Sequence, residues 1–216
     1  MNKKHAIALA ATAAAVLVAT GCAHRSSAEA DQQAVSLIKS SFQPQGIAKL
    51  DRLDQDAANA ACSKALGEPL PDAQAKAIEA ANMKTVPAAP TGGYLGDWKQ
   101  GEKIAQSGRG MTWRDKPGAV NGGNCYNCHQ ISKEEISFGT IGPSLYHYGK
   151  LRGVTDPNSA AAKPIVEYTW GKLWNARATN ACSQMPRFGH QGILDETQLR
   201  HVMALLLDPK SPVNAH

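Results

Sequence analysis

The sequence predicts an all-α protein, and three observations lead to this fold class. Apolar residues recur at spacings of three and four along most of the chain, which is the period of an amphipathic helix. Alternation of the kind found in strands never extends beyond four residues. The final segment has a complete set of helix signals, with Asp195 as N-cap, Gln198 closing a capping box, Leu194 and Leu199 as a hydrophobic staple, and Pro209 after the end.

Residues 1–21 are predicted to be an export leader. Lys3 and Lys4 precede the uncharged apolar run Ala6–Val18, which is shorter than the ~20 residues that a spanning helix needs. Two cleavage sites compete. The stretch VATGC resembles a lipobox and predicts lipidation of Cys22, whereas AEA offers an ordinary signal-peptidase site after Ala30. Both predict export to the periplasm or envelope, where thiols oxidise.

The charge balance argues against nucleic acid as a partner. The chain has 23 basic and 18 acidic side chains without charged runs, and two of the lysines lie in the leader.

An Ala-rich helical extension is expected over residues 22–84. Helical spacing predicts helices at 34–42, 47–66 and 71–83, with Pro71 suited to a first helical turn. Alanine faces bury little apolar area, so this extension is expected to pack on another part of the molecule.

A second region begins after residue 93. Residues 85–93 read as a linker, and all four Trp and all five Tyr follow them. Within a domain over residues 94–208, the expected order is a helix at 95–108, a long Gly/Asn/Ser-rich loop at 109–162, a helix at 164–176, and the punctuated helix after Asp195. Residues 209–216 are expected to form a tail.

The long loop contains Cys125-Tyr126-Asn127-Cys128-His129, a C-x-x-C-H motif. This spacing lets two thiols reach the two vinyl groups of a porphyrin while the next imidazole binds the iron. A zinc site would need a second cysteine pair nearby, and a thioredoxin-like dithiol would need a βαβ context; the sequence has neither. We therefore expect one covalently bound haem c, held by Cys125 and Cys128, with His129 as the proximal ligand.

A ligating histidine needs a partner that orients its other ring nitrogen. In GTIGPSLY, Pro143 is a candidate to present its carbonyl to the His129 ring; a plain Gly-Pro turn explains the same letters equally well.

The second, distal ligand of the iron decides whether a haem protein transfers electrons or binds small molecules at the iron. Met185 is the preferred candidate, because Pro186 stiffens the backbone after it and the segment is a loop between two helices. A His/Met pair raises the reduction potential and leaves no open site. The weaker candidates are Met83, Met111, Met203, His147 and His190, and Met203 falls on the buried stripe of the last helix.

Cys62 and Cys182 remain. In an exported chain they favour a disulfide between the extension and the loop that carries Met185. The alternative is that one of them pairs with a partner protein.

With these motifs in this order, residues 94–208 resemble a class I cytochrome c domain. The resemblance extends to SoxX, the single-haem subunit of the SoxAX cytochromes of bacterial thiosulfate oxidation. It is carried by DWKQGEKIAQSGRGMTW, GGNCYNCHQ, GTIGPSLYHYGKLRG and MPRFGHQGILDETQLRHVMALLLDP, and in the extension by DRLDQD and ACSKAL. C-x-x-C-H alone indicates only a c-type haem, whereas MPRFG together with GTIGPSLY is more specific.

This resemblance implies one haem c on Cys125 and Cys128, with His129 and Met185 as axial ligands. It also implies a SoxA partner that carries the catalytic haem of the L-cysteine S-thiosulfotransferase SoxAX. That complex couples thiosulfate oxidatively to a cysteine of the SoxYZ carrier, and electrons leave toward a cytochrome c. No catalytic residue is expected in this chain, which is assigned the electron-accepting role.

Two other functions stay open at this stage. A free periplasmic electron shuttle would need no dedicated partner, although the long extension argues for one. A sensor of oxygen or another small molecule would require that Met185 does not bind the iron.

Overall fold

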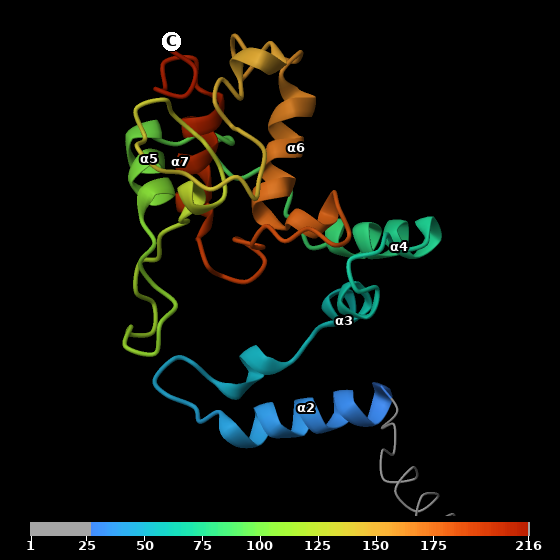
Figure 1. Ribbon diagram of the computed structural model, residues 1–216. Coiled ribbons are helices and arrows are strands. Elements are labelled where there is room, and N and C mark those ends of the chain that lie inside the picture. The colour runs from blue at the N-terminus through green and yellow to red at the C-terminus, as the bar shows by residue number, and fades with distance from the viewer. Residues whose placement is uncertain (1–26, 216) are drawn as a thin grey trace, which may run out of the picture. The chain divides into compact units, whose positions relative to one another are not determined.

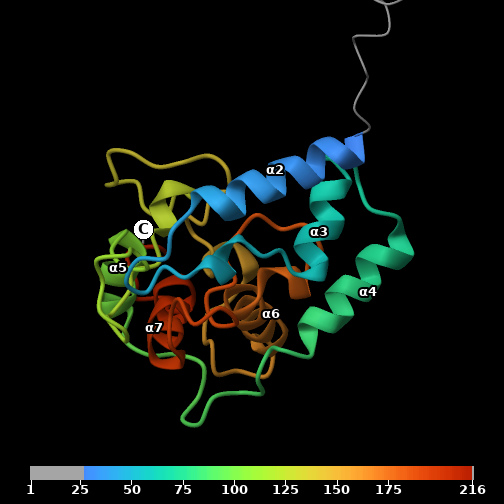
Figure 2. The same cartoon turned by 90° about the horizontal axis from the view of Figure 1, so that it is seen from below.

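The computed structural model describes residues 27–215 and is helical over this range (Figures 1 and 2). Between these limits no strands form, and an isolated bridge joins Gln45 and Ala48. The all-α prediction agrees with this structure. The predictions for the leader and Cys22 lie outside the described residues, whereas Ala30 lies within α2.

The chain divides between Gln43 and Pro44. Helix α2 (Ser27–Ser41) belongs to the first unit, and everything from Pro44 onward forms the second. The predicted division at the 85–93 linker is therefore not where the structure separates, because residues 44–84 belong to the same compact unit as the predicted cytochrome domain.

The single helix expected over 47–66 is wrong. The structure forms a short 3₁₀ turn, η1 (Leu50–Leu53), and then α3 (Ala57–Lys64). Asp56 interrupts the helix because its backbone is extended and its side chain accepts a hydrogen bond from the Asn59 amide at 2.7 Å. A carboxylate that caps a new helix outcompetes continuation of the old one.

Helix α4 (Asp72–Met83) follows Pro71, as expected, and packs on the 3₁₀ turn η4 (Ala176–Ala178). Asn175 Nδ2 donates to Asn82 and to Thr85 at 2.9 Å each. The predicted linker also packs on the domain, since Trp170 Nε1 donates to the Pro87 carbonyl at 3.4 Å.

Helices α5 (Trp98–Gln106) and α7 (Glu196–Leu207) lie side by side in both views (Figures 1 and 2). Gly101 allows their close approach, because a Cβ at this position would collide with the His201 carbonyl. The α7 N-terminus has the predicted capping box between Asp195 and Gln198, and Leu199 is fully buried.

Helix α6 (Lys163–Trp174) packs on α7 and η4 and buries Trp170 in the core. Residues 107–162 have little regular structure apart from the 3₁₀ turns η2 (Cys125–Asn127) and η3 (Lys150–Arg152). The predicted tail packs back, since Val213 is fully buried. Over residues 27–215, no helix is both long and apolar enough to cross a bilayer.

Candidate functional site

Cys125 begins the η2 turn, and Cys128 follows its last residue, Asn127. The amides of Cys128 and His129 both donate to the Cys125 carbonyl, at 3.1 and 2.9 Å. Asn124, just before the turn, has a left-handed backbone (φ 51°), which asparagine tolerates better than most residues. The Gly123 amide donates to the Ile104 carbonyl of α5 at 2.8 Å, which fixes the turn against that helix.

The His129 imidazole is oriented by the loop that follows it. Its Nδ1 lies 2.6 Å from the Pro143 carbonyl oxygen. Because a carbonyl only accepts, Nδ1 is the donor, and in the neutral ring this leaves the lone pair on Nε2. The Gly142 amide donates to the Cys128 carbonyl at 2.8 Å, and a Cβ on Gly142 would collide with the imidazole ring. This is the contact that the sequence proposed for Pro143, and it is the arrangement that a metal-ligating histidine needs.

Both cysteines of the motif are free thiols. Burial of the Cys125 sulfur raises its pKa to about 12. The raised pKa favours the thiol over the thiolate form. Tyr126, between the two cysteines, is buried.

The loop that follows the motif in the sequence has exposed apolar side chains. It exposes Ile136, Phe138 and Ile141 to solvent, with 99%, 39% and 80% of each residue accessible. Gly139 returns this loop to the turn by donating to the Tyr126 carbonyl at 2.8 Å. Exposed apolar side chains grouped in one loop indicate a surface that another apolar group covers.

The predicted distal ligand, Met185, is partly buried and packs on the same hydrophobic core as Cys125 and Leu145. It also lines an open hollow of about 310 Å³ together with Arg187 and Ile193. The structure thus brings Cys125 and Met185, which are 60 positions apart in the sequence, to one hydrophobic core.

The competing ligand candidates have other surroundings. Met203 is fully buried in α7, as its position on the apolar stripe predicted. Met83 is the last residue of α4 and is half exposed. Met111 receives a contact from Asn121 Nδ2 at 3.5 Å. His147 stacks on Tyr146.

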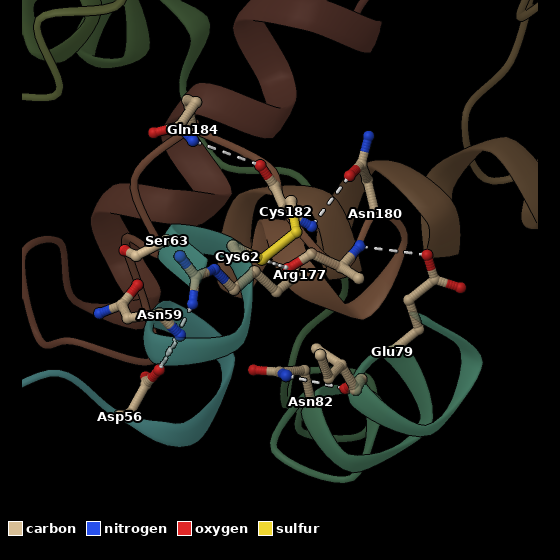
Figure 3. The surroundings of a disulfide bond; sticks show 12 residues. Asp56, Asn59, Cys62, Ser63, Glu79, Asn82, Arg177, Asn180, Cys182 and Gln184 are labelled. Atoms are coloured by element: carbon tan, nitrogen blue, oxygen red, sulfur yellow. Dashed lines mark hydrogen bonds and ion pairs between the residues drawn. A yellow bond between two sulfur atoms is a disulfide. The ribbon is translucent and has the colours of Figure 1, made fainter. Parts of the chain in front are cut away.

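The structure joins Cys62 of α3 to Cys182 by a disulfide, the intramolecular pairing expected from the sequence (Figure 3). Their Cα atoms are 5.6 Å apart, within the usual range for such a bridge. The bond attaches the extension to the segment that leads to Met185.

Sequence reasoning missed an ion-pair cluster beside this bridge. Asp56 Oδ2 lies 2.6 Å from Arg187 Nη1, and Asp56 Oδ1 lies 3.4 Å from Arg177 Nη1. Both arginines are buried. Partial burial raises the pKa of Asp56, but the Asn59 hydrogen bond and the two guanidinium groups outweigh it and the net shift is downward. In the sequence, the feature of Asp56 that could have pointed to this cluster is that aspartate often caps a helix. We expected a continuous helix over 47–66 and therefore did not consider Asp56 as a cap.

The residues present fit a covalent haem. Two cysteines stand at the required spacing, the imidazole that follows them donates from Nδ1 and so leaves Nε2 as the ring nitrogen for a metal, and Cys125 and Met185 pack on one hydrophobic core. Over residues 27–215, no group of three or more His, Cys, Asp or Glu side chains gathers in a way that could hold a metal ion.

No protein-family model matches the chain. The chain is similar to an uncharacterized lipoprotein of Aquifex aeolicus, with 34% identity over 131 residues. The match covers 60% of this chain and 58% of that protein. The chain thus aligns with less than two thirds of the relative's length.

Proposed function

We propose that the chain is the electron-transfer, single-haem c-type cytochrome subunit of a SoxAX complex. The observation that carries the haem assignment is the C-x-x-C-H turn whose His129 Nδ1 donates to the Pro143 carbonyl at 2.6 Å. That hydrogen bond fixes the tautomer that a proximal haem ligand needs.

The arrangement of helices supports a class I cytochrome c fold for residues 94–208. Helices α5 and α7 pack closely at Gly101, and the C-x-x-C-H turn, the Gly142-Pro143 turn and the Met185 loop follow in that order between them. This is the order that the resemblance to class I cytochromes c implies.

Each residue has a defined role in this proposal. A haem c supplies a one-electron iron couple when bound. Cys125 and Cys128 would hold it through thioether bonds, and His129 and Met185 would be the ligands of its iron. The Pro143 carbonyl keeps the His129 ring in place and makes it a stronger donor. With both ligands in place, the group would transfer electrons and leave no position for a substrate.

The same residues favour another chain as the place of the sulfur chemistry. Cys62 and Cys182 are joined to each other, and the haem would occupy Cys125 and Cys128. The catalytic thiolate and catalytic haem are therefore assigned to the SoxA partner. This subunit accepts electrons as thiosulfate is conjugated to a SoxYZ cysteine, and passes them to a downstream cytochrome c.

Export and a lipid anchor complete the proposal. The leader and the lipobox at Cys22 predict an envelope-anchored protein facing the periplasm. The relative from Aquifex aeolicus is called a lipoprotein, which supports lipidation of Cys22 over cleavage after Ala30.

The test is affinity purification of the tagged full-length chain from its native host grown on thiosulfate. We expect a second, haem-staining cytochrome in stoichiometric amount, and thiosulfate-dependent reduction of this chain's haem when SoxYZ is added. A Cys125→Ala/Cys128→Ala variant is the control for both signals. A lone chain that exchanges electrons with many proteins would contradict the SoxAX assignment and favour the free shuttle.

A further inference from the structure

We propose that the extension segment 56–62 positions Met185 as the distal ligand, through one covalent and one ionic attachment on either side of it. This inference rests on the proposed function, because it takes Met185 as an iron ligand. It gives the extension a role within the haem domain itself.

The first attachment precedes Met185. The disulfide from Cys62 holds Cys182, three positions before the methionine, to helix α3. Directly beside it, the Ala181 amide donates to Glu79 Oε1 of α4 at 3.1 Å (Figure 3). Two helices of the extension therefore hold the residues that lead into the Met185 loop.

The second attachment follows Met185. Arg187, two positions after the methionine, forms its 2.6 Å ion pair with Asp56 Oδ2. The Arg187 side chain is only 9% exposed and the Asp56 side chain 42%, so removal of the Asp56 charge would leave a largely buried guanidinium without this partner. The same Asp56 begins α3 by accepting the Asn59 amide, which places both attachments on one short helix.

Between the two attachments, the hydrogen bonds of the loop are local, from the Cys182 amide to Asn180 Oδ1 at 3.2 Å and from the Met185 amide to Ser183 Oγ at 3.3 Å. Beyond Arg187, the Gly189 and His190 amides donate to the Trp174 carbonyl at 3.1 and 3.0 Å, so the segment is fixed again there. Fixing each residue of an irregular segment costs conformational entropy. The attachments on both sides restrict the conformations of the loop, so less conformational entropy is lost when Met185 binds the iron.

The test compares three haem-loaded full-length variants with the natural protein. Cys62→Ala/Cys182→Ala removes the disulfide without leaving a free thiol. Asp56→Asn removes the charge that holds Arg187 but keeps a side-chain oxygen to cap α3. Glu167→Gln is the matched control, since it removes the same charge from an exposed pair with Lys163 at 3.8 Å.

Three readouts are measured on each variant: the far-red absorption band of ferric Met-ligated haem, carbon monoxide binding by the reduced protein, and hydrogen–deuterium exchange of peptides covering 180–190. We expect the two variants that remove an attachment, Cys62→Ala/Cys182→Ala and Asp56→Asn (the anchor variants), to lose part of the far-red band. Their reduced forms should bind carbon monoxide on the order of tenfold more tightly. This follows because the apparent affinity scales with the fraction of molecules in which Met185 has left the iron. Exchange should rise in 180–190 and not in α5 or α7.

The outcomes distinguish the two proposals. A natural protein with no far-red band would overturn both, because Met185 would then not be a ligand. A natural protein with the band, and anchor variants identical to Glu167→Gln in all three readouts, would overturn the positioning role alone. If the double cysteine variant fails to fold, Asp56→Asn decides by the same readouts.

Discussion

At the residue scale, the site depends on contacts that no single position reveals. The sequence predicted His129 as a ligand from the spacing of C-x-x-C-H, and proposed Pro143 as its acceptor, because both belong to short local patterns. It did not predict that Asp56 would bind two buried arginines more than a hundred positions away. Charge pairs of this separation depend on how the chain folds back, which local spacing does not encode.

Gly142→Ala should disturb the His129 site. The added Cβ would collide with the imidazole, so the ring or the Gly142-Pro143 turn has to move. We expect overpacking to lower the free energy of unfolding by about 1–3 kcal/mol. In the haem-loaded protein, the reduction potential should also shift, measured by redox titration.

Gly171→Ala is the control for this substitution. Gly171 lies in α6, and the nearest atom to an added Cβ is Val86 Cγ1 at 3.9 Å, an ordinary contact. Its stability should be unchanged or higher, since alanine favours helix over glycine by about 1 kcal/mol. Equal effects of the two substitutions would contradict the packing of Gly142 on His129.

Asp56 should make stability depend on pH in the acid range. Its folded-state pKa is lowered, so its contribution is fully present above its unfolded pKa and is lost as pH falls through the lower, folded-state value. The unfolded value is about 3.9. Urea unfolding of the natural protein and of Asp56→Asn should therefore differ at neutral pH and converge below about pH 4. A difference that stays constant with pH would show that the ion pair is not the cause.

At the scale of elements, local signals predicted helices well where no competing signal existed. Helix α7 begins and ends where its capping box and Pro209 indicate. The prediction of one helix over 47–66 was wrong. Apolar residues have helical spacing on both sides of Asp56, but the Asp56 carboxylate favours the start of a new helix there. Helical period alone does not separate one long helix from two short ones.

Gly101→Ala should destabilise the packing of α5 on α7. An added Cβ would meet the backbone of His201 in the partner helix, which cannot move as a side chain does. We expect a loss of about 1–3 kcal/mol in spite of the better helix propensity of alanine. Thermal unfolding followed by circular dichroism measures it; a melting temperature equal to or above that of the natural protein would contradict the close approach of these helices.

At the scale of the whole molecule, residues 44–84 form one compact unit with the rest of the chain up to its C-terminus. Composition placed a linker at 85–93, yet Pro90 is buried and Trp170 binds the Pro87 carbonyl. The Pro- and Gly-rich composition of residues 85–93 is typical of a linker, and only the tertiary contacts show that this segment packs on the domain. The cysteine pairing was predictable because exported chains seldom leave two thiols unused.

Removing the disulfide should destabilise the whole unit. The bond closes a separation of 120 residues, for which the chain-entropy model gives up to about 4–5 kcal/mol. Cys62→Ala/Cys182→Ala should show this loss in denaturant unfolding, and a reductant should then have no further effect on it. Unchanged stability in the variant would contradict a structural role for the bond.

The proposed electron transfer requires a porphyrin that is covalently bound to Cys125 and Cys128. The most direct measurement is the intact mass of the mature chain, purified from a host that assembles c-type cytochromes and denatured before analysis. We expect the mass of the polypeptide plus one haem, and we expect the Cys125→Ala/Cys128→Ala variant to lack the mass of the haem. A natural chain that weighs no more than its amino acids and any lipid would contradict it.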